Sequence, residues 1–176
     1  MTDNFNERLQ TMKPIAQLVG VAGTVLLGLF GATSFGQMPL TYRYLCQSIG
    51  TGPQEPLGDR DGHNISVYSY SCRVEGGPLD GGVVTGNAIY EWNQTIAAGL
   101  TGNGVVRKPG AVAVFELSDF KNALTVVDGK VTGFSAAGHG TYKLATGTAV
   151  SLAGRTYTYT GRPNGPGQFA VDIKVD

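Results

Sequence analysis

The sequence has little charge and few of the side chains that hold metal ions. Charged residues make up 15% of the 176 residues, and 13 basic residues balance 13 acidic ones. Nucleic-acid binders usually carry a basic stripe and membrane-surface proteins a polybasic patch, so this balance argues against both classes. Because the chain has only two histidines and two cysteines, a zinc site of three or four ligands is not expected.

Signatures of nucleotide and cofactor enzymes are missing as well. The chain has no Walker loop and no G-x-G-x-x-G segment that opens a helix. The segment GFSAA at residues 133–137 ends in alanine where a hydrolase nucleophile elbow needs glycine. We therefore expect neither a cofactor nor a metal ion.

One long apolar run is present, near the N-terminus. Residues 15–35 contain no charged side chain, Lys13 precedes them, and a polar segment with glycine follows. This pattern is typical of a secretory signal peptide, so residues 1–36 are predicted to be a signal peptide and residues 37–176 a single periplasmic or secreted domain. The run is also long enough to be an uncleaved anchor, and membrane association is expected only in that case. Glycines and polar residues inside the run favour cleavage.

The two cysteines, Cys46 and Cys72, agree with export. An even number of cysteines in an exported chain predicts a disulfide bond. Each cysteine ends a strand-like run, YRYLC or VYSYSC, in which tyrosines share its parity. Since side chains alternate between the faces of a strand, each cysteine lies on the aromatic face of its strand, and two neighbouring strands could be joined there. Two free buried thiols are the alternative.

After the N-terminal run, the hydrophobic pattern has period two and not the period of a helix. The segment QFAVDIKVD at 168–176 alternates strictly, and RTYTYTGR at 155–162 separates tyrosines from threonines. Asp128-Gly129 lies between two such runs and is a strong signal for a tight hairpin. We predict an all-β fold, an antiparallel β-barrel of about eight strands, in which some of the 27 glycines serve bends and close approaches. Residues 49–64 are predicted to be a long loop.

Two places could carry acid/base chemistry. Asp59, Asp61 and His63 alternate in the segment DRDGH, where carboxylates and an imidazole could meet. A calcium loop that starts at Asp59 is excluded, because its twelfth residue is Tyr70 and not glutamate. The other candidate is His139, which stands between two glycines. An ordinary polar turn and an ordinary strand histidine are the competing interpretations.

Aromatic residues in strand-like segments are the most suggestive feature. Lined up inside a barrel, they could surround an apolar cavity that has a few polar tips. They could equally fill the barrel as its core. The predicted pocket residues are Tyr42, Tyr44, Tyr68, Tyr70, Tyr90, Trp92, Tyr142, Tyr157 and Tyr159.

The segment GFSAAGHGTY at residues 133–142 resembles a glycine-rich strand of the allene-oxide-cyclase and dirigent-like barrels. The resemblance implies an eight-stranded antiparallel barrel with an apolar cavity, often in a dimer or trimer, so a homo-oligomer is expected. Plant members of that group guide cyclisation or radical coupling of small hydrophobic molecules without a cofactor. Their catalytic residues have no counterpart that can be placed on this chain, so the resemblance implies no activity.

These observations favour an exported barrel that binds a small apolar ligand or a protein partner. The first alternative is a cofactor-free isomerase or cyclase that acts on a small hydrophobic substrate. It would use His63 or His139 with a nearby carboxylate, and it predicts that one of these histidines lines the pocket. The second alternative is a structural envelope protein whose barrel is filled.

Overall fold

The chain folds into a meander of antiparallel strands with one short 3-10 helix, η1. The computed structural model describes residues 40–51 and 54–176, and the predicted signal peptide or anchor lies outside them. No helix in the described ranges is long and apolar enough to cross a membrane. In chain order the elements are β1 Leu40–Thr51, β2 Glu55–Pro56, β3 His63–Glu75, β4 Val83–Asn93, β5 Ile96–Lys108, β6 Ala111–Val127, β7 Lys130–Gly147, η1 Val150–Leu152, β8 Thr156–Pro163 and β9 Gln168–Val175.

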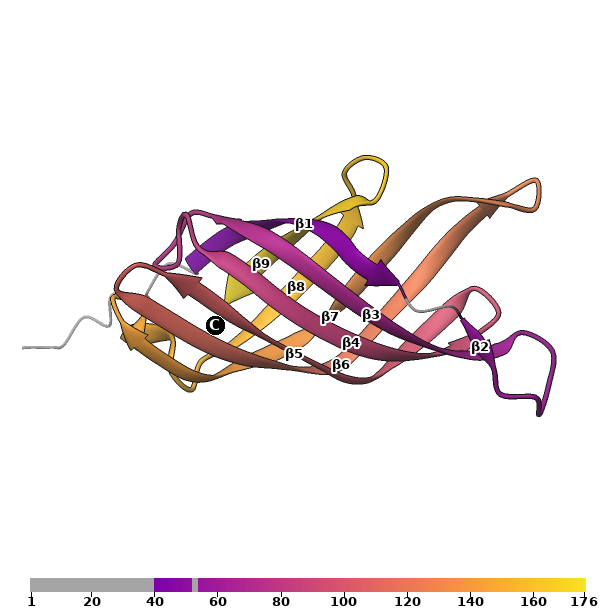
Figure 1. Ribbon diagram of the computed structural model, residues 1–176, viewed down its shortest axis with the longest axis horizontal. Coiled ribbons are helices and arrows are strands. Elements are labelled where there is room, and N and C mark those ends of the chain that lie inside the picture. Colours follow the sequence, from indigo (N-terminus) through magenta and orange to yellow (C-terminus); the bar gives the residue numbers. More distant parts are fainter. Residues whose placement is uncertain (1–39, 52–53) are drawn as a thin grey trace, which may run out of the picture. The chain divides into compact units, whose positions relative to one another are not determined.

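Eight of the strands close into a barrel (Figure 1), which confirms the predicted fold class. Sequential neighbours pair from β3 to β9, and β1 closes the barrel by pairing with β9 on one side and β3 on the other. Closure pairs the strands of the barrel on both sides, so that outer edges stay unpaired in the described residues mainly at the tip of the β6–β7 hairpin. Paired edges protect a strand-rich chain from edge-to-edge association. The two-residue strand β2 pairs with the beginning of β3.

The hairpins form where the sequence predicts turns. Asp128 and Gly129 join β6 to β7 and have φ values of 50° and 72°. Positive φ at both positions is the requirement of a type I′ turn, and Asp-Gly meets it. This hairpin is longer than its neighbours, since pairing to β5 stops at Ala123 and pairing to β8 stops at Ala136. Its tip therefore extends beyond the ends of the two strands that flank it, β5 and β8 (Figure 1).

Glycines on the inner face of the wall make room for aromatic rings. A Cβ atom on Gly140 would lie 2.2 Å from the ring of Tyr157, and one on Gly99 would lie 2.1 Å from the ring of Phe120. Neither position can hold a larger residue unless the ring moves. The high glycine content of the strands thus allows large rings to lie flat against the wall of a narrow barrel.

Bulges change which residues face inward along the longest strands. On β6 the register shifts between Ser118 and Lys121, where Asp119 has a φ of 47°. Phe115 and Leu117 face the interior before this bulge, and Phe120 and Asn122 face it afterwards. The bulge thus moves the inner face from odd to even residue numbers.

Two local features depart from a simple reading of the sequence. Strict alternation along β7 would give Leu144 the same face as Tyr142, but a bulge follows Tyr142, so Leu144 is exposed and Ala145 is buried. The segment 49–64 is not simply a long loop. Its first residues complete β1, its middle contains β2, and its end turns into β3.

The two ends of the barrel differ in how they are filled. At the end where β3 finishes and β4 begins, which we call the closed end, Leu79 of the intervening turn and Leu152 of η1 are fully buried. Tyr142 is also fully buried there, and its hydroxyl contacts the hydroxyls of Tyr42 and Tyr44. The opposite end, where β1 finishes and β3 begins, is called the open end.

Candidate functional site

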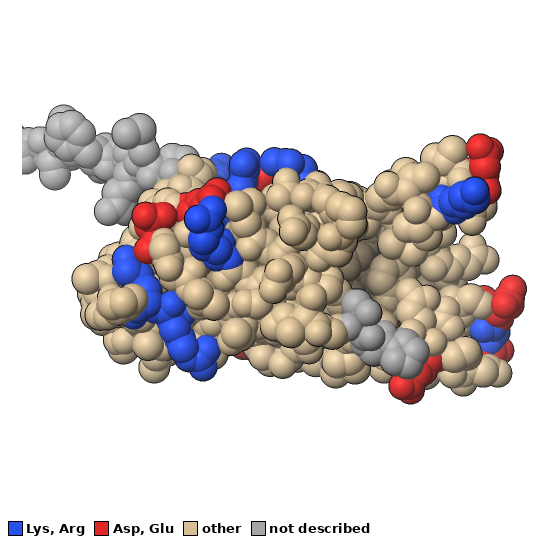
Figure 2. Space-filling model, turned by 45° about the horizontal axis from the view of Figure 1, so that its top comes forward, with Lys and Arg blue, Asp and Glu red and all other residues tan. Residues whose placement is uncertain are grey.

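A cavity of ≈ 310 Å³ occupies the open half of the barrel. Figure 2 shows the surface hollowed at this end. The volume lies at the lower end of the range for small-molecule pockets. Ten aromatic residues line it: Tyr44, Tyr68, Tyr70, Tyr90, Trp92, Phe115, Phe134, Tyr157, Tyr159 and Phe169. Among the described residues, no charged side chain lines the cavity.

Alternation along the strands explains why the wall is aromatic. Tyr68 and Tyr70 on β3, and Tyr90 and Trp92 on β4, are separated by two positions and so share the inner face. Phe169 on β9 packs against both Tyr68 and Tyr70, with ring centroids 6.0 and 6.1 Å apart. Aromatic pairs at such distances hold one another in place, so the wall is formed before any ligand arrives.

The tyrosine hydroxyls supply polar groups in an otherwise apolar wall. Burial raises the pKa of Tyr90 to about 12 against the opposing effect of the Asn122 side chain, and burial also raises the pKa of Tyr70 and Tyr159. These hydroxyls therefore stay protonated at neutral pH. In the described part of the chain, the hydroxyls of Tyr70 and Tyr159 form no hydrogen bond. They can both donate to and accept from a bound molecule.

Asn122 on β6 adds an amide to the cavity wall. Its Oδ1 atom is buried and has no hydrogen-bond partner among the described residues. A buried acceptor that lacks a partner costs about 1–3 kcal/mol. The hydroxyl oxygen of Ser66, by contrast, has a hydrogen-bond partner, since Trp92 Nε1 donates to Ser66 Oγ over 2.8 Å. The orphaned oxygen of Asn122 is a feature that a bound molecule could use.

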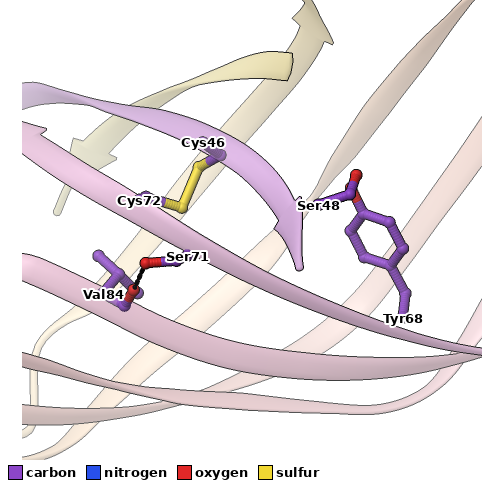
Figure 3. The surroundings of a disulfide bond; sticks show 6 residues. All are labelled: Cys46, Ser48, Tyr68, Ser71, Cys72 and Val84. Atoms are coloured by element: carbon purple, nitrogen blue, oxygen red, sulfur yellow. Dashed lines mark hydrogen bonds between the residues drawn. A yellow bond between two sulfur atoms is a disulfide. The ribbon is translucent and has the colours of Figure 1, made fainter. Parts of the chain in front are cut away.

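The disulfide bond is part of the same wall. Cys46 and Cys72 lie directly opposite each other on β1 and β3, with their sulfurs 2.10 Å apart (Figure 3). This confirms the predicted pairing. Both residues line the cavity. Nearby, Tyr68 and Ser48 join the same two strands through hydroxyls 2.6 Å apart (Figure 3).

His63 does not reach the cavity. It lies on the outer face at the start of β3, where it is only 7% exposed. Its Nδ1 atom is 2.5 Å from Asp59 Oδ1, and its Nε2 atom is 2.7 Å from Glu91 Oε1. The hydrogen bonds to Asp59 and then to Glu91 raise the pKa of His63, and the bond to His63 lowers the pKa of Asp59.

This arrangement fastens the turn before β3 to the outside of β4. Both imidazole nitrogens are occupied, so neither is free to move a proton to or from a substrate. The carboxylates are at opposite edges of the ring and cannot share one metal ion with it. Consistent with this, no group of three or more metal-binding side chains occurs in residues 40–51 and 54–176.

The other acid/base candidates are also outside the cavity. Asp61 is exposed in the turn that precedes β3. His139 is exposed on β7, between Ser118 of β6 and Thr158 of β8. The cyclase hypothesis needs a histidine in the pocket wall, and the structure places neither histidine there.

The nine predicted pocket residues all point into the barrel. Seven line the cavity, whereas Tyr42 and Tyr142 pack in the closed end and do not. Reasoning from the sequence missed three aromatic cavity residues, Phe115, Phe134 and Phe169, and it also missed Asn122. The signal available for Asn122 was the spacing in LSDFKNAL, where apolar residues change parity between Leu117 and Phe120.

A second hollow, of ≈ 480 Å³, lies over β1, β8 and β9. Most of its lining is polar and faces outward, including Arg43 and Asp172, which form an ion pair of 2.6 Å. Exposed charged pairs of this kind are ordinary surface features. The cavity in the open half is therefore the candidate site.

Compared with models of known protein families and with curated protein sequences, the chain matches none.

Proposed function

We propose that this is an exported protein, periplasmic or secreted, that binds a small apolar molecule in the open half of its barrel. The observation that carries the proposal is an uncharged, aromatic-lined cavity that opens at one end of an otherwise filled barrel. Apolar pockets with a few convergent polar groups are typical of small-molecule sites.

Export rests on two independent features. The apolar segment at residues 15–35 has the pattern of a signal peptide. The disulfide between Cys46 and Cys72 is compatible with an oxidising compartment. The resemblance to allene-oxide-cyclase and dirigent-like barrels implies a cavity of the same kind, and it stays a prediction.

Binding is favoured over catalysis for a chemical reason. An isomerase or cyclase without a cofactor needs a group that moves protons near the reacting atoms. In the described wall, the titratable side chains are tyrosines, and burial holds the pKa of Tyr70, Tyr90 and Tyr159 above the ordinary value. A wall of this kind suits retention of a neutral hydrophobic molecule.

The only tryptophan of the chain, Trp92, lies in the cavity wall and reports its occupancy. We expect the apolar dye N-phenyl-1-naphthylamine to bind saturably and to quench Trp92 fluorescence by energy transfer. Ala136→Leu puts extra volume into the cavity from β7, and we expect it to weaken dye binding at least about tenfold, roughly 1.4 kcal/mol.

Ser135→Leu is the matched control, because Ser135 is the next residue on the same strand and is exposed on the outer face. This variant should bind the dye as the unchanged protein does. Equal loss in both variants, or no loss in either, would place the dye outside the cavity and contradict the proposal. Native mass spectrometry of the protein purified from its own source should also show a retained small molecule.

A further inference from the structure

Two features of the fold direct the Asn122 side chain into the cavity and leave space around it. The bulge at Asp119 turns it inward, and its partners on the adjacent strands are both alanines, Ala97 and Ala136. Small neighbours leave space over the amide. Its oxygen is buried without a partner in the described residues, although buried polar groups in native structures are nearly always paired.

Other polar groups lie near this amide. Tyr70, Tyr90 and Tyr159 line the same cavity as Asn122. The Asn122 side chain also opposes the rise that burial causes in the pKa of Tyr90. The cavity thus has a polar side, made by one amide and several hydroxyls. The rings of Trp92, Phe134 and Phe169 supply apolar surface.

No charged side chain is among the described residues of the cavity wall, and this limits which chemical groups of a ligand the polar side can bind. A carboxylate, phosphate or ammonium group in this cavity would be desolvated without a counter-charge, which is strongly unfavourable. An uncharged group is required. Since Asn122 Oδ1 can only accept, the group must donate a hydrogen.

Resting on the proposed function, we infer that the natural ligand is a compact, uncharged apolar alcohol whose hydroxyl donates a hydrogen bond to Asn122 Oδ1. A hydroxyl also accepts, so the same group can take a hydrogen bond from a tyrosine of the polar side. An ether or a ketone of the same shape cannot satisfy Asn122. Asn122 is therefore the residue that determines ligand specificity.

Three molecules with one skeleton test this inference: 1-adamantanol, 1-methoxyadamantane and 1-adamantanecarboxylate. Each is used to displace N-phenyl-1-naphthylamine from the disulfide-bonded protein. We expect the alcohol to displace the dye about fivefold to tenfold more effectively than the ether, and the carboxylate to be the weakest.

Two variants assign the preference to the amide. Asn122→Leu should bind the alcohol and the ether equally. Gln54→Leu, which replaces the exposed amide at the mouth of the cavity, should keep the preference for the alcohol. Because Asn122→Leu also removes an unsatisfied acceptor, the ligand-free variant should unfold at a higher urea concentration than the unchanged protein, which shows that it is folded.

The outcomes separate this inference from the proposed function. Three results would overturn the assignment of an alcohol and still leave a binding cavity. The dye binds, but the alcohol and the ether displace it equally, the carboxylate displaces it best, or none of the three displaces it. Persistence of the preference in Asn122→Leu overturns the role of Asn122. A dye that does not bind at all overturns the proposed function itself.

Discussion

The closed and open halves of the barrel share the same strands but differ in what occupies their interior. In the closed half, the turn residue Leu79 and the helix residue Leu152 fill the space between the strand ends, and both are fully buried. In the open half no such plug is present among the described residues, and rings line the wall without filling the centre. Alternation decides which side chains face inward, and the connecting segments decide whether the interior is closed.

The difference teaches that most of the tightly packed interior lies outside the cavity wall, although the disulfide bond belongs to that wall. Burial of apolar side chains is the main driving force of folding, and most of the largest fully buried side chains, such as Val106, Tyr142 and Val175, do not line the cavity, whereas Tyr157 does. The cavity wall retains accessible apolar surface that a ligand could cover. The same type of substitution, made once in each half, should therefore change the free energy of unfolding by different amounts.

The largest effect is expected from the disulfide, which lies in the cavity wall and joins β1 to β3. Cys46 and Cys72 are 26 residues apart, so loss of the bond should lower the free energy of unfolding by about 3.5 kcal/mol on the chain-entropy model. Urea titration of the Cys46→Ala/Cys72→Ala variant measures this. The unchanged protein treated with a reductant should give the same midpoint. A midpoint that does not move would show that the bond constrains neither half.

Truncation of a leucine in each half compares the two directly. Leu152→Ala empties a fully buried site in the closed half and should cost about 3 kcal/mol, because a cavity remains. Leu124→Ala removes a partly exposed side chain from an existing cavity and should cost about 1 kcal/mol. Chemical unfolding of both variants gives the two values. Equal losses would mean that the open half is packed as tightly as the closed half.

Replacement of an alanine by leucine adds volume instead of removing it, and we again expect the larger loss of stability at the fully buried position. Ala113 is fully buried, and Ala113→Leu should cost about 2 kcal/mol through overpacking. Ala136 faces the cavity, so Ala136→Leu should change the stability by less than about 1 kcal/mol while it weakens dye binding. Thermal unfolding with and without dye checks both statements. A large loss of stability in Ala136→Leu would argue that this side chain has no free space before it.

Much of this architecture could be predicted from the sequence because alternation and turn chemistry are local. The Asp-Gly hairpin, the inward-facing tyrosines of β3 and the pairing of Cys46 with Cys72 all follow from parity and from the even cysteine count. The hairpin and the tyrosines depend on residues that are close in the chain, and the disulfide can be predicted because the chain has only two cysteines.

The rest depends on contacts between distant residues. The bulge at Asp119 sends Asn122 inward. The change of parity between Leu117 and Phe120 signals a bulge in the sequence, but the pairing with β7 fixes where the register shifts. His63 and Glu91 meet because β3 and β4 align, although they are 28 positions apart. Whether rings fill a barrel is a matter of volume, which residue order does not specify.

The smallest effect is expected outside both halves, at the turn that His63 fastens. Hydrogen bonds to Asp59 and Glu91 raise the pKa of His63 above 6.5. Its contribution to stability is therefore fully present below about pH 6.5 and is lost as the pH rises through the raised value. The pKa of Asp59 is lowered from 3.8, so its contribution is present above that pH and is lost on further acidification.

The urea midpoint of the unchanged protein should therefore exceed that of His63→Gln at about pH 5.5, and the gap should shrink toward about pH 9. The effect is small because both carboxylates are exposed to water, with side chains 51% and 42% accessible. His139→Gln is the matched control, because it removes the exposed histidine of β7 and leaves the hydrogen bonds of His63 in place. Dye affinity should stay constant over the same range, since no histidine is among the described residues that line the cavity. A dye affinity that follows the titration of His63 would show that the outer turn and the cavity are coupled, and that the open half is less independent of its surroundings than its packing indicates.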